Sequence, residues 1–386
     1  MKIVCVPDSF KGSMSAAAAA AALAAGARQS LPGAEVLALP FADGGEGTLD
    51  ALLAAWGVEE RVAEVVDALG RRRWARWALG PDGATALIEG AEGNGLPAVA
   101  DVAPQPLRAD SFGVGLLVRA ALNAGATRIL LTLGGSASTD GGSGILRALG
   151  ARLLDSGGNP VPPGGEGLAA VARVDLSGLD PRARAAHWEL AVDVDNPLTG
   201  PRGAAAVFGP QKGAGPEDVA RLDAGLARFA QVLGESAAGT VNADAVDPGA
   251  RGMGAAGGIP LALAAVFGAQ LRPGAQLVAE AVGLDAALTD VNLVLTGEGR
   301  LDTQSLAGKV VAEIRRRTPQ RVPVVVIAGA VQLPAAACRD AGLVAFSLAP
   351  GPADLGQLRD KAPQLLEDAA AQACTLAAWG NISRYS

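Results

Sequence analysis

Histidine, tyrosine and cysteine are scarce in this chain of 386 residues, which contains one histidine, one tyrosine and three cysteines. Because His187 is the only histidine, zinc sites built on two or more histidines are excluded. A Ser-His-Asp or Cys-His catalytic site would have to use His187 as its histidine. The cysteines, Cys5, Cys338 and Cys374, are far apart and form no CxxC pair, which is typical of a reduced cytosolic protein. We expect the three cysteines to be buried apolar residues and His187 to be structural.

Charge is also limited, because only 18% of the residues are charged and the formal net charge is −7. Lysine and arginine are scattered along the chain, so no basic patch for nucleic acid or an anionic membrane is evident. The apolar start MKIVCV is too short for a signal peptide, and the low-polarity stretch 16–25 could span only about half of a bilayer core. We expect a cytoplasmic protein with no nucleic-acid or membrane partner, and a homo-oligomer remains open.

The chain is rich in small and apolar residues, with 52 glycines and a hydrophobic fraction of 50%. Its length suggests two or three domains. At both chain ends, short apolar runs at 2–6, 35–40, 292–296 and 322–328 end in turns and precede helix-like segments, which indicates a mostly parallel sheet. In the middle, the runs 74–79 and 85–89 flank the turn sequence GPDG, which predicts an antiparallel hairpin.

These patterns predict an α/β protein with two lobes. Residues 1–66 and 290–386 are expected to form a discontinuous, Rossmann-like lobe with a parallel sheet, and residues 67–289 an inserted mixed α/β lobe.

Glycine-rich acidic turns follow several of the expected strands, where ligands bind in open α/β sheets. No standard nucleotide motif fits them. Gly308-Lys309 has Thr303 where a Walker A loop needs glycine and Val310 where it needs serine or threonine. The glycine pair at 297 and 299 has Asp302 at the third position of a dinucleotide fingerprint, so nicotinamide cofactors lose support.

The charged residues of these turns fit phosphoryl transfer from ATP, which needs carboxylates to hold Mg²⁺ and to accept a proton from the attacking hydroxyl. For each acid taken alone, a helix-capping or turn role is equally open. The acids are Asp8, Asp43, Glu46, Asp140, Asp193, Asp195, Glu298 and Asp302, and the candidate cations are Lys11, Lys212, Arg300 and Lys309.

Six segments in order resemble the glycerate kinase family of type 1, the family of bacterial glycerate 2-kinase. They are PDSFKG (7–12), ADGGEGT (42–48), GGSASTDGG (134–142), DVDNPL (193–198), FGPQKG (208–213) and TGEGRLD (296–302). The resemblance covers residues 2 to about 330. It implies cytoplasmic, ATP- and Mg²⁺-dependent phosphorylation of D-glycerate, with two α/β lobes around a cleft. We expect 2-phosphoglycerate rather than 3-phosphoglycerate as the product.

The role of each residue is a hypothesis from its chemistry. For the substrate, we expect Lys11 and Arg300, with the N–H groups of residues 9–12, to bind the glycerate carboxylate. Asp8 and Ser9 complete the predicted substrate-binding set.

For catalysis, Asp195 is our candidate for the base, Asp193 is the second choice, and Lys212 is expected to neutralise charge on the transferred group. Glu298 and Asp43 are expected to hold Mg²⁺. The predicted nucleotide-binding residues are Gly134, Gly135, Ser136, Ser138 and Lys309.

Three alternatives remain open. The protein could be a kinase for another short hydroxy acid, a hydroxyacid dehydrogenase, or a non-catalytic module that binds a sugar acid or a nucleotide. The missing dinucleotide fingerprint disfavours the dehydrogenase, and the density of acids at the turns disfavours a simple anion-binding module.

Overall fold

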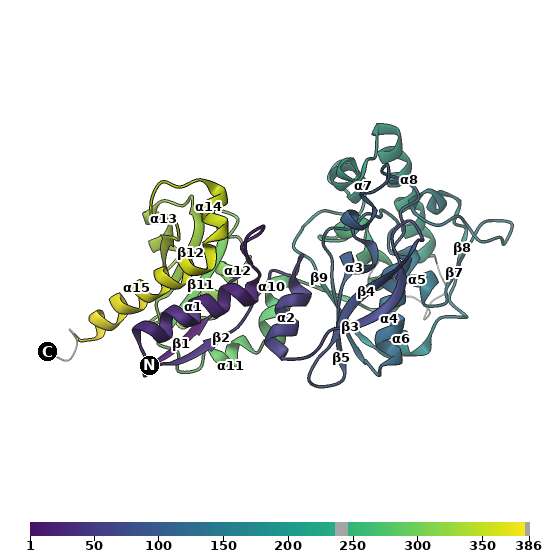
Figure 1. Ribbon diagram of the computed structural model, residues 1–386. Coiled ribbons are helices and arrows are strands. Elements are labelled where there is room, and N and C mark those ends of the chain that lie inside the picture. Colours follow the sequence, from purple (N-terminus) through teal and green to yellow (C-terminus); the bar gives the residue numbers. More distant parts are fainter. Residues whose placement is uncertain (236–245, 383–386) are drawn as a thin grey trace. The chain divides into compact units, whose positions relative to one another are not determined.

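The computed structural model describes residues 1–235 and 246–382, and its contacts divide the chain into two compact units (Figure 1). Unit 1 consists of Met1–Asp43, Asp50–Gly57 and Pro273–Ser386, and unit 2 of Gly44–Leu49 and Val58–Arg272. The lobe boundaries expected at 66/67 and 289/290 stay a prediction.

Unit 1 is built on a five-stranded sheet in which all neighbouring strands are parallel. The strand order is β13-β12-β11-β1-β2. The strands are β1 (Lys2–Cys5), β2 (Glu35–Ala38), β11 (Leu293–Leu301), β12 (Val324–Val331) and β13 (Leu343–Ser347). The helices are α1 (Ala16–Ser30), α10 (Gly274–Ala281), α11 (Leu284–Ala287), α12 (Val310–Arg317), α13 (Ala335–Asp340), α14 (Leu355–Asp360) and α15 (Ala362–Ile382), and α2 (Thr48–Trp56) begins in unit 2 and continues into unit 1.

Helices cover both faces of this sheet, because successive side chains of a strand point to opposite sides. Ile3 and Cys5 of β1 pack in the core formed with α1 and α15, whereas Val4 belongs to the core formed with α10 to α13. The helices α1 and α15 lie side by side (Figure 1) and approach so closely that a Cβ on Gly26 would come 2.1 Å from the carbonyl oxygen of Glu367. All three cysteines are buried and free, as expected.

Unit 2 contains a mixed six-stranded sheet of order β10-β9-β6-β5-β4-β3. Its strands are β3 (Arg61–Val66), β4 (Arg72–Leu79), β5 (Thr85–Glu89), β6 (Arg128–Thr132), β9 (His187–Ala191) and β10 (Gln270–Arg272), and β7 (Arg152–Leu154) pairs with β8 (Arg173–Asp175). The predicted hairpin is confirmed, because β4 and β5 pair antiparallel, whereas β5, β6, β9 and β10 are parallel neighbours.

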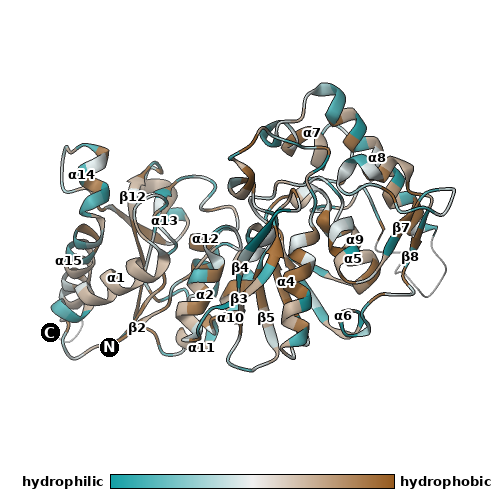
Figure 2. Ribbon diagram, turned by 45° about the vertical axis from the view of Figure 1, so that its right-hand side comes forward, coloured by the Kyte–Doolittle hydropathy of each residue, from teal (hydrophilic) through white to brown (hydrophobic). Residues whose placement is uncertain are grey.

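The helices of unit 2 complete its core. They are α3 (Gly90–Asn94), α4 (Phe112–Asn123), α5 (Ser143–Ala148), α6 (Pro181–Ala185), α7 (Ala204–Phe208), α8 (Pro216–Gly234) and α9 (Ile259–Phe267). Apolar residues of α4 and of the strands β5 and β6 share one large core, and one side of α4 is coloured apolar in Figure 2. The predicted class is confirmed: a parallel-sheet unit made from both chain ends and a mixed α/β unit between them.

One segment differs from its predicted structure. The sequence TGEGRLD was expected to be a turn that follows a strand ending at residue 296, but β11 continues to Leu301. Glu298 and Arg300 pair with Ala328 and Ala330 of β12, so the backbone stays extended through both glycines. The helix that follows, α12, begins only at Val310.

Candidate active site

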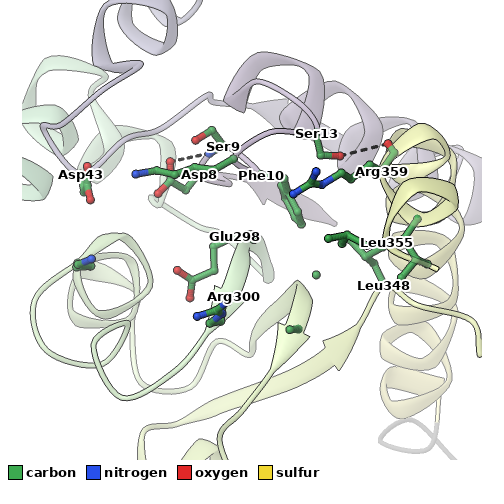
Figure 3. Close-up of a pocket in the computed structure, with 17 residues that line it drawn as sticks. Asp8, Ser9, Phe10, Ser13, Asp43, Glu298, Arg300, Leu348, Leu355 and Arg359 are labelled. Carbon is green, nitrogen blue, oxygen red and sulfur yellow. Dashed lines mark hydrogen bonds between the residues drawn. The ribbon is translucent and has the colours of Figure 1, made fainter. Parts of the chain in front are cut away.

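A cavity of about 510 Å³ lies in unit 1, where the strands of the parallel sheet reach their carboxyl ends (Figure 3). Its wall contains the segment after β1, the last residues of β11 and β12, and residues after β13. This is the edge at which open α/β sheets bind their ligands. The lining residues are Asp8, Ser9, Phe10, Lys11, Ser13, Asp43, Glu298, Gly299, Arg300, Lys309, Gly329, Ala330, Leu348, Leu355, Leu358, Arg359 and Ala362.

Three carboxylates line the cavity, and two of them are poorly solvated. Burial, followed by the nearby charge of Asp43, raises the pKa of Asp8 to about 6. Burial also raises the pKa of Glu298 to about 7, with further contributions from the charges of Asp8 and Asp302. Glu298 Oε1 is buried and has no hydrogen-bond partner among the described residues. The site therefore holds concentrated negative charge that its own side chains do not fully compensate.

Cationic side chains share the cavity with these acids. Lys11 follows β1, Arg300 lies on β11, and Lys309 immediately precedes α12. Ser9 contributes its backbone N–H, which donates to Asp8 Oδ1 at 2.6 Å. The cavity thus brings together all four predicted substrate-binding residues, both predicted metal-binding residues, and Lys309 from the nucleotide-binding set.

The extended course of β11 explains how two of these groups face the same space. Glu298 and Arg300 are two residues apart on a strand, so their side chains lie on the same face. Phe10, in the segment after β1, packs its ring against β11. A Cβ on Gly297 would come 3.0 Å from Phe10 Cζ. Glycine is required at this position by close packing.

The donor set fits Mg²⁺. This ion prefers oxygen ligands and is usually held by one or two carboxylates together with substrate phosphates. The described residues contain no cluster of three or more acidic, histidine or cysteine side chains arranged to hold a metal ion alone. The unpartnered Oε1 of Glu298 and the carboxylate of Asp43 in the same cavity are suitable for such a shared site.

The other predicted nucleotide-binding residues lie in unit 2, on the loop after β6. Gly135 has a φ of 63°, in the left-handed region that favours glycine. The ammonium of Lys212 is buried and donates to Ser136 Oγ at 3.0 Å and to the carbonyl oxygen of Ser138 at 2.5 Å. Burial lowers the pKa of Lys212 to about 8. Lys212 therefore anchors the loop that contains the predicted phosphate-binding residues.

Asp140 organises the end of this loop from a fully buried position. Its Oδ2 accepts hydrogen bonds from the backbone N–H groups of Ser111 and Gly144 and from the Ser111 hydroxyl. Its Oδ1 accepts from the hydroxyl of Ser138 and from the N–H of Gly142. For Asp140, both a role in phosphoryl transfer and a helix-capping or turn role were left open, and its contacts match the structural role.

Replacing Asp140 with asparagine is expected to lower the free energy of unfolding by about 3 kcal/mol or more, because an amide nitrogen cannot accept hydrogen bonds and Lys212 would lose its buried counter-charge. Urea denaturation measures this change. Asp155→Asn, in an exposed turn where Oδ1 accepts from two backbone N–H groups, is the control and should cost clearly less. Equal stabilities for the two variants would contradict the central role of Asp140.

Asp193 and Asp195, the candidate bases, follow β9 in unit 2. The carboxylate of Asp195 is half exposed and contacts the guanidinium groups of Arg202, at 3.1 Å, and Arg251, at 3.6 Å. His187, at the start of β9, has an exposed side chain 3.8 Å from Glu189.

Some residues near these sites carried no signal in the sequence. Glu89, at the end of β5, accepts hydrogen bonds from the N–H groups of Gly47 and Leu49 and so holds the glycine-rich turn of unit 2. In the cavity of unit 1, Leu355, Leu358 and Arg359 come from α14, which is not part of any recognised motif. Only the folded chain brings them to the turn after β1.

Comparison with known proteins extends over almost the whole chain. A family model described as "Glycerate kinase family" matches residues 3–378. The chain is similar to a glycerate kinase of Bacillus subtilis (strain 168), with 42% identity over 95% of both chains. It is also similar to a glycerate 2-kinase of Escherichia coli (strain K12), with 44% identity over 86% of both chains.

The fold agrees with these sequence relationships. A crystal structure from Salmonella typhimurium LT2, of a protein described as a glycerate kinase 2, matches with a TM-score of 0.89 and 42% identity over 99% of both chains. The similarity therefore includes both units and the segments between them.

Proposed function

The chain belongs to the glycerate kinase family, and from this membership we propose that it transfers the terminal phosphoryl group of ATP to D-glycerate. In this reaction a hydroxyl oxygen of glycerate forms a bond to the γ-phosphorus. The bond from that phosphorus to the bridging oxygen breaks, ADP leaves with the electron pair, and the hydroxyl proton passes to a base. The favoured product is 2-phosphoglycerate. The cavity in unit 1, with its cations beside poorly solvated carboxylates, supports this proposal most directly.

Substrate binding is assigned to the cations of the cavity. Lys11 and Arg300 would bind the carboxylate of glycerate, because a small acid needs fixed charges to hold one hydroxyl in line with the phosphoryl group. The N–H groups of the turn after β1 would add further donors. Asp8 and Ser9, in the same turn, would bind the hydroxyl groups of the substrate.

The carboxylates of Glu298 and Asp43 would hold Mg²⁺. When bound, this ion supplies positive charge that neutralises the phosphates of ATP during transfer. Two observations support the assignment: the unpartnered Glu298 Oε1, and the pKa of this residue, which burial raises to about 7.

The remaining roles concern the phosphates and the proton. The loop after β6 would bind the phosphates of ATP through Gly134, Gly135, Ser136 and Ser138. Lys212, which donates hydrogen bonds to Ser136 and Ser138, would add positive charge to this loop. Lys309 would contact the nucleotide from the cavity of unit 1.

The base that accepts the hydroxyl proton is proposed to be Asp195, with Asp193 as the second choice. As a carboxylate at the end of a strand, Asp195 has the chemistry that the step requires, and its contacts with Arg202 and Arg251 restrict its orientation.

Cellular location is part of the same proposal, and we place the protein in the cytoplasm. The three free, buried cysteines are those of a protein in a reducing environment. In the described part of the chain, no helix is both long and apolar enough to cross a membrane.

The function is tested by measuring ADP release from ATP with D-glycerate, L-glycerate, glycolate and D-lactate as separate acceptors. We expect D-glycerate to give the highest kcat/KM and removal of divalent cations with a chelator to abolish turnover, with recovery on adding Mg²⁺. A higher kcat/KM with another acid would instead identify a kinase for that hydroxy acid. Binding of glycerate and ATP without ADP release would favour the non-catalytic alternative.

A further inference from the structure

The cavity in unit 1 has two chemically different ends. The charged end contains the acids and the cations already described, and the other end is apolar. In Figure 3, Asp8, Asp43 and Glu298 lie to one side of Phe10, and Leu348 and Leu355 to the other. The apolar lining is contributed by Phe10, Leu348, Leu355, Leu358 and Ala362.

The apolar end is partly open to solvent, although it is made of large hydrophobic side chains. Leu355 on α14 is 62% exposed, while Leu348 and Phe10 in the same cavity are buried. Arg359, also on α14, lies against the turn after β1, where a Cβ on Gly12 would come 3.8 Å from its Nη2 and Ser13 Oγ donates to its carbonyl oxygen at 3.3 Å. An apolar surface beside a cluster of charges is the usual composition of a small-molecule site.

The proposed reaction limits what could occupy this end. Glycerate is a three-carbon acid with two hydroxyl groups, and the phosphates and Mg²⁺ are fully charged, so none of them gains from contact with leucine side chains. The purine base of ATP is the one component with large apolar faces. A cavity of about 510 Å³ is also large for a three-carbon acid alone.

We propose that the apolar end of the cavity binds the purine base of ATP, between Phe10 and the leucines of α14. The inference rests on the proposed function and adds the location of the nucleoside to it. Arg359 is placed to stack its guanidinium on the base or to contact the ribose, because a planar guanidinium packs well on aromatic faces. The base would thus lie in the same unit as Lys309, which was expected to bind the nucleotide from the sequence alone.

The test is the replacement of Leu355 with glutamate, which places a charge in the apolar end. Because this side chain is 62% exposed, the variant should fold normally. The control is Leu376→Glu on α15, which is 61% exposed and lies outside the cavity. The first readout is the Kd for ADP, measured by titration calorimetry without glycerate. The second is the KM for ATP and for D-glycerate.

We expect Leu355→Glu to weaken ADP binding and to raise the KM for ATP by about tenfold or more, because a carboxylate would have to be desolvated against the base. The KM for glycerate and all constants of Leu376→Glu should stay within twofold of the wild type. Unchanged ADP binding in Leu355→Glu, with an active wild type, would overturn the inference while leaving the function intact. A wild type that binds ADP but phosphorylates no hydroxy acid would refute the proposed function and leave the base-binding site standing.

Discussion

Replacing Glu298 with glutamine is expected to make the unliganded protein more stable at pH 8 and, at the same time, to lower its turnover by roughly 100-fold or more. Both effects have the same cause: the carboxylate of Glu298 is poorly solvated, and it is the group proposed to bind Mg²⁺. Glutamine removes the charge that is costly in the free protein, but it also removes the charge proposed to hold Mg²⁺.

The sign of the stability change follows from the pKa of Glu298, which the fold raises from 4.5 to about 7. Between these values the folded protein binds more protons than the unfolded chain, so stability falls as the pH rises through this range. Above about pH 7 the full cost of the buried charge is present. The glutamine variant should then exceed the wild type by on the order of 1–2 kcal/mol, after discounting for partial exposure, and the difference should disappear near pH 4.

Thermal unfolding at pH 8 and pH 4 measures this difference, and Glu313→Gln is the matched control. Glu313 also lies in unit 1, but hydrogen bonds from Arg316 and Arg317 lower its pKa despite its burial. Its replacement should destabilise the protein at pH 8 and leave turnover unchanged. A Glu298→Gln variant that is less stable than the wild type at pH 8, or that keeps turnover within threefold, would refute the assignment.

Replacing Asp195 with asparagine is expected to reduce kcat by at least roughly 100-fold, the usual contribution of a general base. The change should hardly affect stability, because the contacts of Asp195 with Arg202 and Arg251 are exposed, and such pairs contribute less than about 1 kcal/mol. The measurement is kcat with saturating ATP and D-glycerate.

Asp101→Asn is the control for this experiment, because Asp101 is also an exposed aspartate paired with an arginine, Arg71. It should behave as the wild type. If Asp195→Asn keeps kcat within threefold, Asp195 is not the base. The same measurement on Asp193→Asn then decides whether the second choice takes its place.

The sequence was informative where structure depends on local pattern. The apolar run of β1 and the GPDG turn between β4 and β5 are visible in the order of residues, and the strand and the hairpin they predict are present. The end of β11 was not predictable in this way. Glycines at 297 and 299 indicate a turn, but here they serve close packing against Phe10 and pairing with β12.

The candidate site was also predictable only in part. Most of its charged residues lie near the carboxyl ends of predicted strands, and parallel strands bring such ends together, so their position in one cavity was predictable. Its apolar end was not, because Leu355 and Arg359 meet the turn after β1 only through the path of the chain between β13 and α15. An exposed leucine on a short helix has no sequence pattern that distinguishes it from an ordinary surface residue.

The central claim is that this chain phosphorylates D-glycerate, and at the hydroxyl that gives 2-phosphoglycerate. The most direct measurement supplies the protein with ATP, Mg²⁺ and D-glycerate and follows phosphoenolpyruvate formation by enolase, with and without phosphoglycerate mutase. We predict phosphoenolpyruvate with enolase alone. A strict requirement for the mutase would identify 3-phosphoglycerate as the product, and no phosphoenolpyruvate under either condition would contradict the claim that the chain is a glycerate kinase.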